Sequence, residues 1–189
     1  MRRFSFRPGL ELRGRKFLGL RGFAGKPAHP PLTDVPIGAY VIGPALDVIA
    51  FLWKGSSWAD DVHRAAGLTL LVGAVVSVGT AITGFADWLD TSKGTQIRRM
   101  VNAHAWTMIT MTVAVLIDLA LRYLADGFDG PSGVLALLGL VILALAIVGG
   151  TLGGTLVYDF GFNVETATDN PVYHPSDGDI VHPHDTPAS

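Results

Sequence analysis

The sequence contains no cysteine and few charged residues. Among its 189 residues there is no Cys, and Asp, Glu, Lys and Arg together make up 16%. Without thiols the chain cannot form a disulfide framework, a zinc–thiolate site or an iron–sulfur cluster of its own. Soluble domains carry about 25% charged residues, whereas this chain is 49% hydrophobic, with a mean hydropathy of +0.41. The composition therefore indicates a protein whose solvent is the lipid bilayer.

The motifs of common enzyme classes are also missing. The chain has no Gly-rich phosphate-binding loop, no nucleophile elbow and no metalloprotease motif. Residues 1–28 are basic, with eight Lys or Arg and one Glu, but this arm is too short to form a nucleic-acid-binding module. The sequence therefore favours a protein that is not an enzyme and has no nucleic acid among its partners.

The chain contains four apolar runs that are long enough to span a membrane. They cover residues 35–53, 65–85, 100–121 and 133–158, and a transmembrane helix needs about 20 residues. Because the connecting segments are short, consecutive helices must be antiparallel. The predicted fold class is all-α, a four-transmembrane-helix up-down-up-down bundle over residues 29–160. A basic amphipathic or disordered arm (1–28) precedes it, and an acidic disordered tail (161–189) follows.

The distribution of positive charge predicts the orientation. The arm and the second loop together carry eleven Lys or Arg, whereas the first and third loops carry three. Positive charge is concentrated in the cytoplasmic segments of membrane proteins. The expected location is a bacterial inner membrane, crossed several times, with both termini in the cytoplasm.

The first helix follows a stretch with unusual backbone constraints, AHPPLTDVPIG at residues 28–38. Pro30 and Pro31 favour extended backbone before the helix. Either Thr33 or Asp34 is then expected to cap the helix N-terminus. This arrangement fixes His29 at the mouth of a membrane-spanning helix.

Ionisable residues at membrane depth are costly, so each one is a candidate functional residue. The predicted topology sorts them into two layers. The inner layer comprises His29, Asp34, Asp87, His104 and Tyr158. The outer layer comprises Asp47, His63, Asp118 and Arg122. Asp118 and Arg122 are four residues apart, a spacing that predicts an ion pair on one helix face.

Three interpretations of the inner layer remain open. His29 and His104 could be the axial ligands of a haem b in the bundle. The same two histidines, with the carboxylates of Asp34 and Asp87, could instead bind a transition-metal ion. In the third interpretation no cofactor binds, and His104 forms a hydrogen bond with Asp34 or Asp87 that locks the helices together.

Small residues recur every four positions on two of the predicted helices. The first set is Thr69, Gly73, Ser77 and Ala81, and the others are Gly149 with Gly153 and Gly150 with Gly154. Small side chains permit close helix packing in lipid. A cofactor lying against the helices would use the same positions.

Four stretches carry a resemblance to a known family: GKPAHPPLTDVPIGAY, TGFADW, RRMVNAHAW and GGTLVYDFGFNV. Over about residues 25–164 the chain resembles a bacterial four-helix membrane domain of unknown function, the DUF2231 type. The residues that match the family pattern are His29, Pro30, Asp34, Pro36, Asp87, Trp88, His104, Gly153, Gly154 and Tyr158. In many relatives a Rieske iron–sulfur domain follows this domain, which implies membrane electron transfer with haem or quinone.

These observations predict a polytopic membrane protein that serves as an electron-transfer module or as the membrane anchor of a separate redox partner. Since the chain has no cysteine, a Rieske-type cluster would belong to another polypeptide. Other expected partners are the lipid bilayer and a second copy of the chain. The alternatives are a structural or partner-binding membrane protein without a cofactor, and a membrane protein that binds a transition metal.

Overall fold

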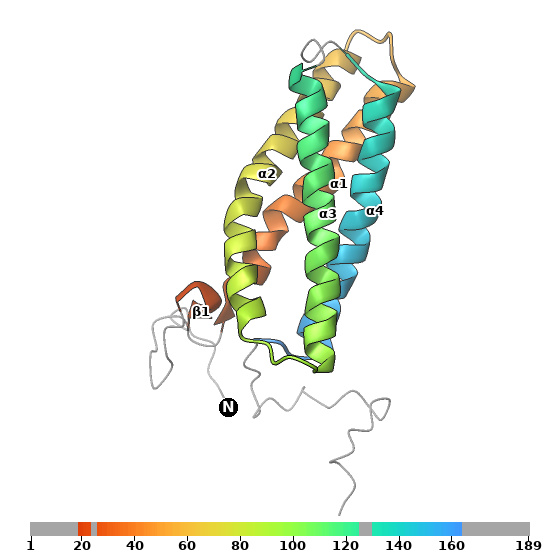
Figure 1. Cartoon of the computed structure of the whole chain (residues 1–189). Helices are drawn as coiled ribbons and strands as arrows, with labels where there is room; N and C mark the ends of the chain where they lie inside the picture. The colour runs from red at the N-terminus through yellow and green to blue at the C-terminus, as the bar shows by residue number, and fades with distance from the viewer. Residues whose placement is uncertain (1–18, 24–25, 125–129, 164–189) are drawn as a thin grey trace, which may run out of the picture.

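The computed structural model describes residues 19–23, 26–124 and 130–163, and four long helices account for most of them (Figure 1). They are α1 (His29–Leu52), α2 (Ala59–Leu89), α3 (Gln96–Leu124) and α4 (Gly133–Tyr158). A 3₁₀ turn, η1 (Gly19–Arg21), and two antiparallel two-residue strands, β1 (Gly22–Phe23) and β2 (Lys26–Pro27), precede them. The predicted all-α four-helix bundle is confirmed.

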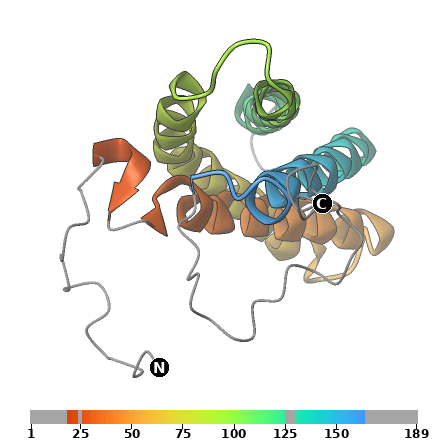
Figure 2. The same cartoon turned by 90° about the horizontal axis from the view of Figure 1, so that it is seen from below.

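The helices alternate in direction and form two hairpins. The α1–α2 connection lies at one end of the bundle, and the α2–α3 connection lies at the other end with β1 (Figure 1). α1 packs most extensively on α2, and α3 packs on α4. Contacts between α1 and α4 join the two hairpins, whereas α2 and α3 pack against each other much less (Figure 2).

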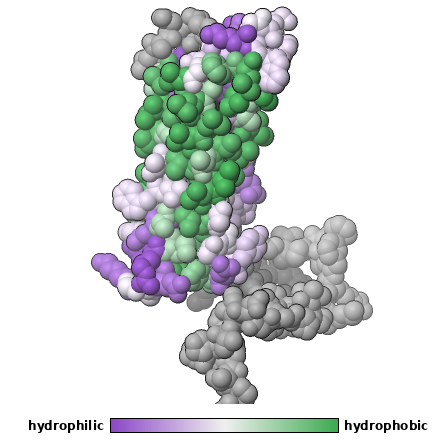
Figure 3. All heavy atoms as spheres, turned by 90° about the vertical axis from the view of Figure 1, so that its right-hand side faces the viewer, coloured by the Kyte–Doolittle hydropathy of each residue, from purple (hydrophilic) through white to green (hydrophobic). Residues whose placement is uncertain are grey.

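The surface between the two ends is apolar. All four helices are long and apolar enough to cross a membrane, and Figure 3 shows hydrophobic residues covering the middle of the molecule, with polar residues at both ends. Large side chains such as Val75, Ile109 and Leu137 are at least half exposed. Because lipid does not penalise such exposure as water does, the chain is a multi-pass membrane protein.

The start of α1 differs from the prediction. The helix begins at His29, six residues before the predicted start of the apolar run, and contains Pro30 and Pro31 in its first turn. Proline is tolerated there because a first-turn N–H has no intrahelical partner to lose. The expected cap at Thr33 or Asp34 is wrong, since both lie inside the helix and no side chain caps it.

The predicted small-residue face of α2 packs against α1 at its centre. Gly73 is buried, and a Cβ at this position would lie 2.7 Å from the Cβ of Ala39. Ser77 donates to the carbonyl of Gly73, so the hydroxyl of Tyr40 donates to Ser77 across the interface at 2.7 Å. Ala81, the last member of the set, is exposed.

Only one of the two glycine pairs on α4 packs against another helix. A Cβ at Gly149 would contact Met108 of α3, and one at Gly153 would contact His104 of α3. Nothing lies within 4 Å of the corresponding point at Gly150, and Gly154 meets only Tyr158 of its own helix. The packing face of α4 is thus the one that bears Gly149 and Gly153.

Candidate functional site

The two histidines of the inner layer meet between the hairpins. His29 is the first residue of α1 and His104 lies in the third turn of α3. Their ring centroids are 6.2 Å apart, and the ring planes make an angle of 83°. The predicted similar depth of these two residues is therefore confirmed, and they are close enough to share a ligand.

Each imidazole is hydrogen-bonded to a backbone carbonyl of the other helix in its hairpin. His29 Nδ1 donates to the carbonyl of Thr80 on α2 at 3.0 Å, and His104 Nδ1 donates to the carbonyl of Gly149 on α4 at 2.9 Å. A carbonyl oxygen can only accept, so the hydrogen must be on Nδ1 in both rings. In the neutral tautomer, Nε2 of each ring keeps its lone pair.

Each ring also lies against a glycine one turn after the residue whose carbonyl it contacts. A Cβ at Gly84 would be 2.7 Å from Cε1 of His29, and a Cβ at Gly153 would be 3.1 Å from Cε1 of His104. Thr80 with Gly84 and Gly149 with Gly153 share the same i, i+4 spacing. The two hairpins therefore hold their histidines in the same way.

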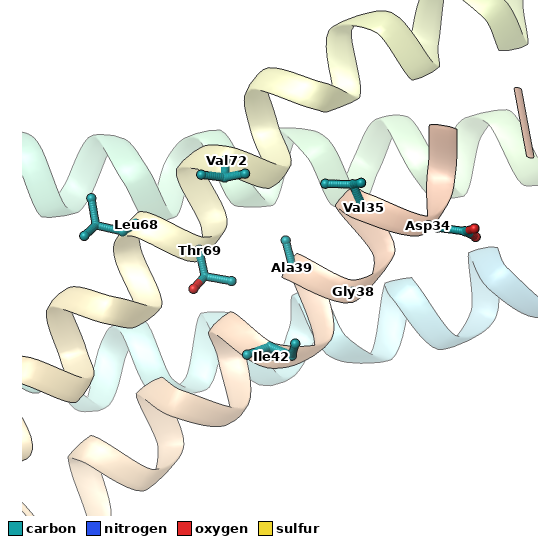
Figure 4. Close-up of a pocket in the computed structure, with 8 residues that line it drawn as sticks. All are labelled: Asp34, Val35, Gly38, Ala39, Ile42, Leu68, Thr69 and Val72. Carbon is teal, nitrogen blue, oxygen red and sulfur yellow. The ribbon is translucent and has the colours of Figure 1, made fainter. Parts of the chain in front are cut away.

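The other predicted members of the inner layer lie elsewhere. Asp34 is exposed and lines a shallow groove between α1 and α2 with apolar residues such as Val35 and Val72 (Figure 4). Tyr158 is 86% exposed at the end of α4. The expected hydrogen bond from His104 to Asp34 or Asp87 is not formed, because its Nδ1 donates to a backbone carbonyl instead.

Asp87 fastens both flanking segments to the end of α2. This buried carboxylate accepts a hydrogen bond from Asn163 Nδ2 at 2.9 Å and lies 3.9 Å from Arg21 Nε. Arg21 also pairs with Asp90, and its carbonyl accepts a second bond from Asn163 at 3.0 Å. Asp87 thus joins the two segments that flank the bundle.

A metal site built from the histidines and carboxylates of the inner layer is not formed. Within the described ranges 19–23, 26–124 and 130–163, no three His, Cys, Asp or Glu side chains are placed to hold one metal ion. What the structure brings together is the pair His29 and His104.

The outer layer forms one buried cluster, which we call the outer cluster: Asp47, His63, Asp118 and Arg122. The predicted pair of Asp118 and Arg122 is confirmed, with Nε and Oδ1 2.5 Å apart. Arg122 also pairs with Asp47 of α1, whose other oxygen accepts from His63 Nδ1 of α2 at 2.9 Å. The cluster therefore ties α1, α2 and α3 together.

A family model described as "Predicted membrane protein (DUF2231)" matches residues 25–166, about three quarters of the chain. The chain belongs to the DUF2231 family of predicted membrane proteins. Searches of curated proteins and of solved structures found no match. The matched range includes both histidines and the outer cluster. The DUF2231 family and the four apolar helices agree that this is a multi-pass membrane protein.

Two stretches of the DUF2231 pattern also stabilise the α2–α3 connection, which the sequence analysis did not predict. They are TGFADW and RRMVNAHAW. Arg98 lies 3.6 Å above the ring centre of Trp88 and donates to the carbonyls of Trp88 and Thr91. The indole of Trp88 donates to Asn102 at 2.8 Å. The sequence did contain a signal for this contact. Arg98 follows Trp88 by ten residues across a short loop, and this spacing allows a cation–π contact.

Proposed function

We propose that this protein binds haem b between its two hairpins, with His29 and His104 as axial ligands, and serves as a membrane electron-transfer module or as the anchor of a separate redox partner. The observation that carries the proposal is the distance between the two rings. A metal–imidazole bond is about 2 Å long and the ring centre lies roughly 1 Å behind the nitrogen, so axial imidazoles have centres about 6 Å apart. The separation here is 6.2 Å.

The hydrogen bonds of the two rings support the same function. Histidine ligands usually donate their other ring N–H to a carbonyl or carboxylate, which fixes the tautomer and makes the ligating nitrogen more basic. His29 and His104 do this through Thr80 and Gly149. When bound, the haem supplies one-electron chemistry at an iron whose potential depends on its axial ligands and burial.

The chain's own contribution is to hold the ligands and exclude water. Gly84 and Gly153 let the rings lie directly against α2 and α4. Because α2 and α3 pack against each other less than the other neighbouring helices do, the hairpins are least closely joined along that side. This seam is the part of the bundle that can separate without breaking the α1–α4 contact.

Charge and composition support a location and a class of partner. Eleven of the Lys and Arg residues are in the arm and the second loop, which supports termini in the cytoplasm of a bacterium and a site near the inner face of its plasma membrane. The proposed electron-transfer partner is a protein of Rieske or similar type, whose cluster ligands are not among these 189 residues.

The test is the visible spectrum of the full chain, expressed with added haem precursor and purified in detergent. A Soret band that shifts on reduction with dithionite is expected, and His29→Ala or His104→Ala should remove or shift it. Added imidazole should restore the band in His104→Ala by replacing the lost ligand. Trp106→Ala, a 68% exposed position on the same helix, should leave the spectrum unchanged.

A structural function is the second candidate, favoured by the two interhelical histidine–carbonyl bonds. In that case the wild-type protein stays colourless even with excess haem, which refutes the first proposal. His104→Ala should then lower the free energy of unfolding by about 0.6 kcal/mol, which is typical of an interhelical hydrogen bond in a membrane protein.

A further inference from the structure

The outer cluster is chemically unlike the histidine pair. Its four side chains are at most 2% exposed, although each can carry a charge. Asp118 follows His104 by 14 residues on the same helix, which places it about 21 Å further along the helix axis. The outer cluster is therefore a separate site, and its charges must be balanced by groups within the cluster or next to it.

The charges of the outer cluster do not balance when both carboxylates are ionised. Arg122 is the one permanent cation, against Asp47 and Asp118. His63 already donates its Nδ1 hydrogen to Asp47, and Nη1 of Arg122 lies 3.3 Å from both ring nitrogens. With a neutral His63, one negative charge is therefore in excess.

No other described side chain at this end of the bundle supplies the missing charge. α4 has one titratable residue, Tyr158, which lies at the opposite end of the helix. The charged residues near the ends of α1 and α2 are all exposed: Lys54, Asp60, Asp61 and Arg64. Tyr123, next to Arg122, is 56% exposed. The excess charge therefore belongs to the buried residues themselves.

One atom of the outer cluster has no partner. Asp118 Oδ1 accepts from Arg122, but Asp118 Oδ2 is buried and forms no hydrogen bond with any part of the chain that the structure describes. A bare carboxylate oxygen in a buried apolar setting is among the costliest arrangements a protein can hold. A proton on Oδ2 removes both the bare charge and the imbalance.

We propose that Asp118 Oδ2 holds one exchangeable proton, which makes the outer cluster an intramembrane proton-binding site. The reaction is the dissociation of the carboxylic acid to carboxylate and a proton, with no other bond formed or broken. In the protonated state the guanidinium of Arg122 balances Asp47 alone. In the deprotonated state the cluster carries a net negative charge, which favours local opening toward water at the outer end.

The test is the pH dependence of unfolding of the full chain in detergent. Unfolding exposes Asp118, which then loses its proton at neutral pH. The folded state binds one proton more than the unfolded state, so stability must fall as pH rises. Between about pH 7.5 and 9, where exposed histidines are already neutral, the unfolding equilibrium constant should rise about tenfold per pH unit.

Matched variants identify the proton-binding atom. Asp118→Asn keeps the shape of the side chain but cannot ionise, so its unfolding should not depend on pH in this range. Asp60→Asn, at an exposed position in the first turn of α2, and His63→Gln should both keep the wild-type slope. A flat wild-type profile, or a slope lost in His63→Gln and kept in Asp118→Asn, overturns the assignment.

Infrared spectroscopy gives an answer even if Asp118→Asn does not fold. Wild-type protein in detergent at pH 7.5 should show the C=O stretching band of a protonated carboxyl group, and the band should persist to about pH 9 and weaken only above it, where the tenfold dependence ends. Its absence would refute the proposal. So would stabilisation by sodium chloride beyond that by an equal concentration of choline chloride, because a sodium ion would then be the missing charge.

Discussion

The contact between Gly84 and His29 makes a sharp prediction about stability. A Cβ on Gly84 would lie 2.7 Å from Cε1 and 2.9 Å from Nδ1 of His29, whereas nonbonded carbon atoms prefer about 3.5–4.0 Å. In Gly84→Ala the imidazole must therefore move away from α2 by several tenths of an ångström. The same displacement strains the bond from Nδ1 to the carbonyl of Thr80.

The expected loss follows from three contributions. Forcing extra volume into a packed contact costs about 1–3 kcal/mol, and losing an interhelical hydrogen bond in a membrane protein costs about 0.6 kcal/mol. Alanine is a better helix former than glycine by about 1 kcal/mol, which offsets part of this cost. Gly84→Ala should therefore destabilise the bundle by about 1–2 kcal/mol.

The measurement is equilibrium unfolding in mixed detergent micelles, followed by circular dichroism. Gly79→Ala is the matched control because Gly79 lies on the same helix with nothing within 4 Å of its Cβ position. This control should be as stable as the wild type or slightly more stable. Equal stability of the two variants would show that His29 does not lie against Gly84, and would remove one support of the haem proposal.

Three further predictions concern other parts of the bundle. Reporter fusions in the first, second and third loops should report outside, inside and outside, and the reverse pattern would contradict the orientation drawn from the basic residues. Gly153→Leu should lower the detergent melting temperature because its side chain would push into His104, whereas Gly150→Leu, at an open position, should not. Arg98→Lys should weaken the α2–α3 connection by about 0.5–1 kcal/mol, since Lys loses the planar contact with Trp88. Faster proteolysis of that connection would reveal the loss, and an unchanged rate would mean that the stacking is dispensable.

The number and order of the helices could be predicted because the bilayer imposes a length. Four apolar runs of about 20 residues or more, separated by short polar segments, leave little choice of topology. The bounds of α4 are those predicted, 133–158. α2 and α3 begin earlier than predicted, at Ala59 and Gln96, since helical hydrogen bonding continues past the point where the side chains become polar.

The start of α1 was harder to predict because proline gives two opposite signals. Pro30 and Pro31 exclude a helix interior but suit a first turn, and nothing local decides between the two. Once His29 contacts the carbonyl of Thr80, tertiary packing favours the helical first turn. The predicted start of α1 is wrong because the two prolines were expected to precede the helix, whereas they lie in its first turn.

A specific side-chain pair could be predicted only where both partners lie on one helix. Asp118 and Arg122 are four residues apart and do form the expected ion pair. The partners of His104 could not be read in this way, because a backbone carbonyl leaves no signature in the side-chain sequence. The shared spacing of Thr80 with Gly84 and of Gly149 with Gly153 becomes meaningful only when the hairpins are assembled.

Polar groups inside a bilayer need hydrogen-bond or charge partners, and the two polar layers meet this requirement in different ways. At the inner end each imidazole donates its one N–H to a carbonyl, which satisfies the backbone and leaves on each ring a nitrogen lone pair that can bind a metal. At the outer end the guanidinium of Arg122 contacts both carboxylates directly, so these charged groups satisfy one another. Between the two layers Tyr40, Met111 and Ile142 are fully buried, and the hydroxyl of Tyr40 is hydrogen-bonded to Ser77. α1 carries both His29 and Asp47, and α3 carries both His104 and Asp118, so a shift of either helix would move a residue of each site and couple the two.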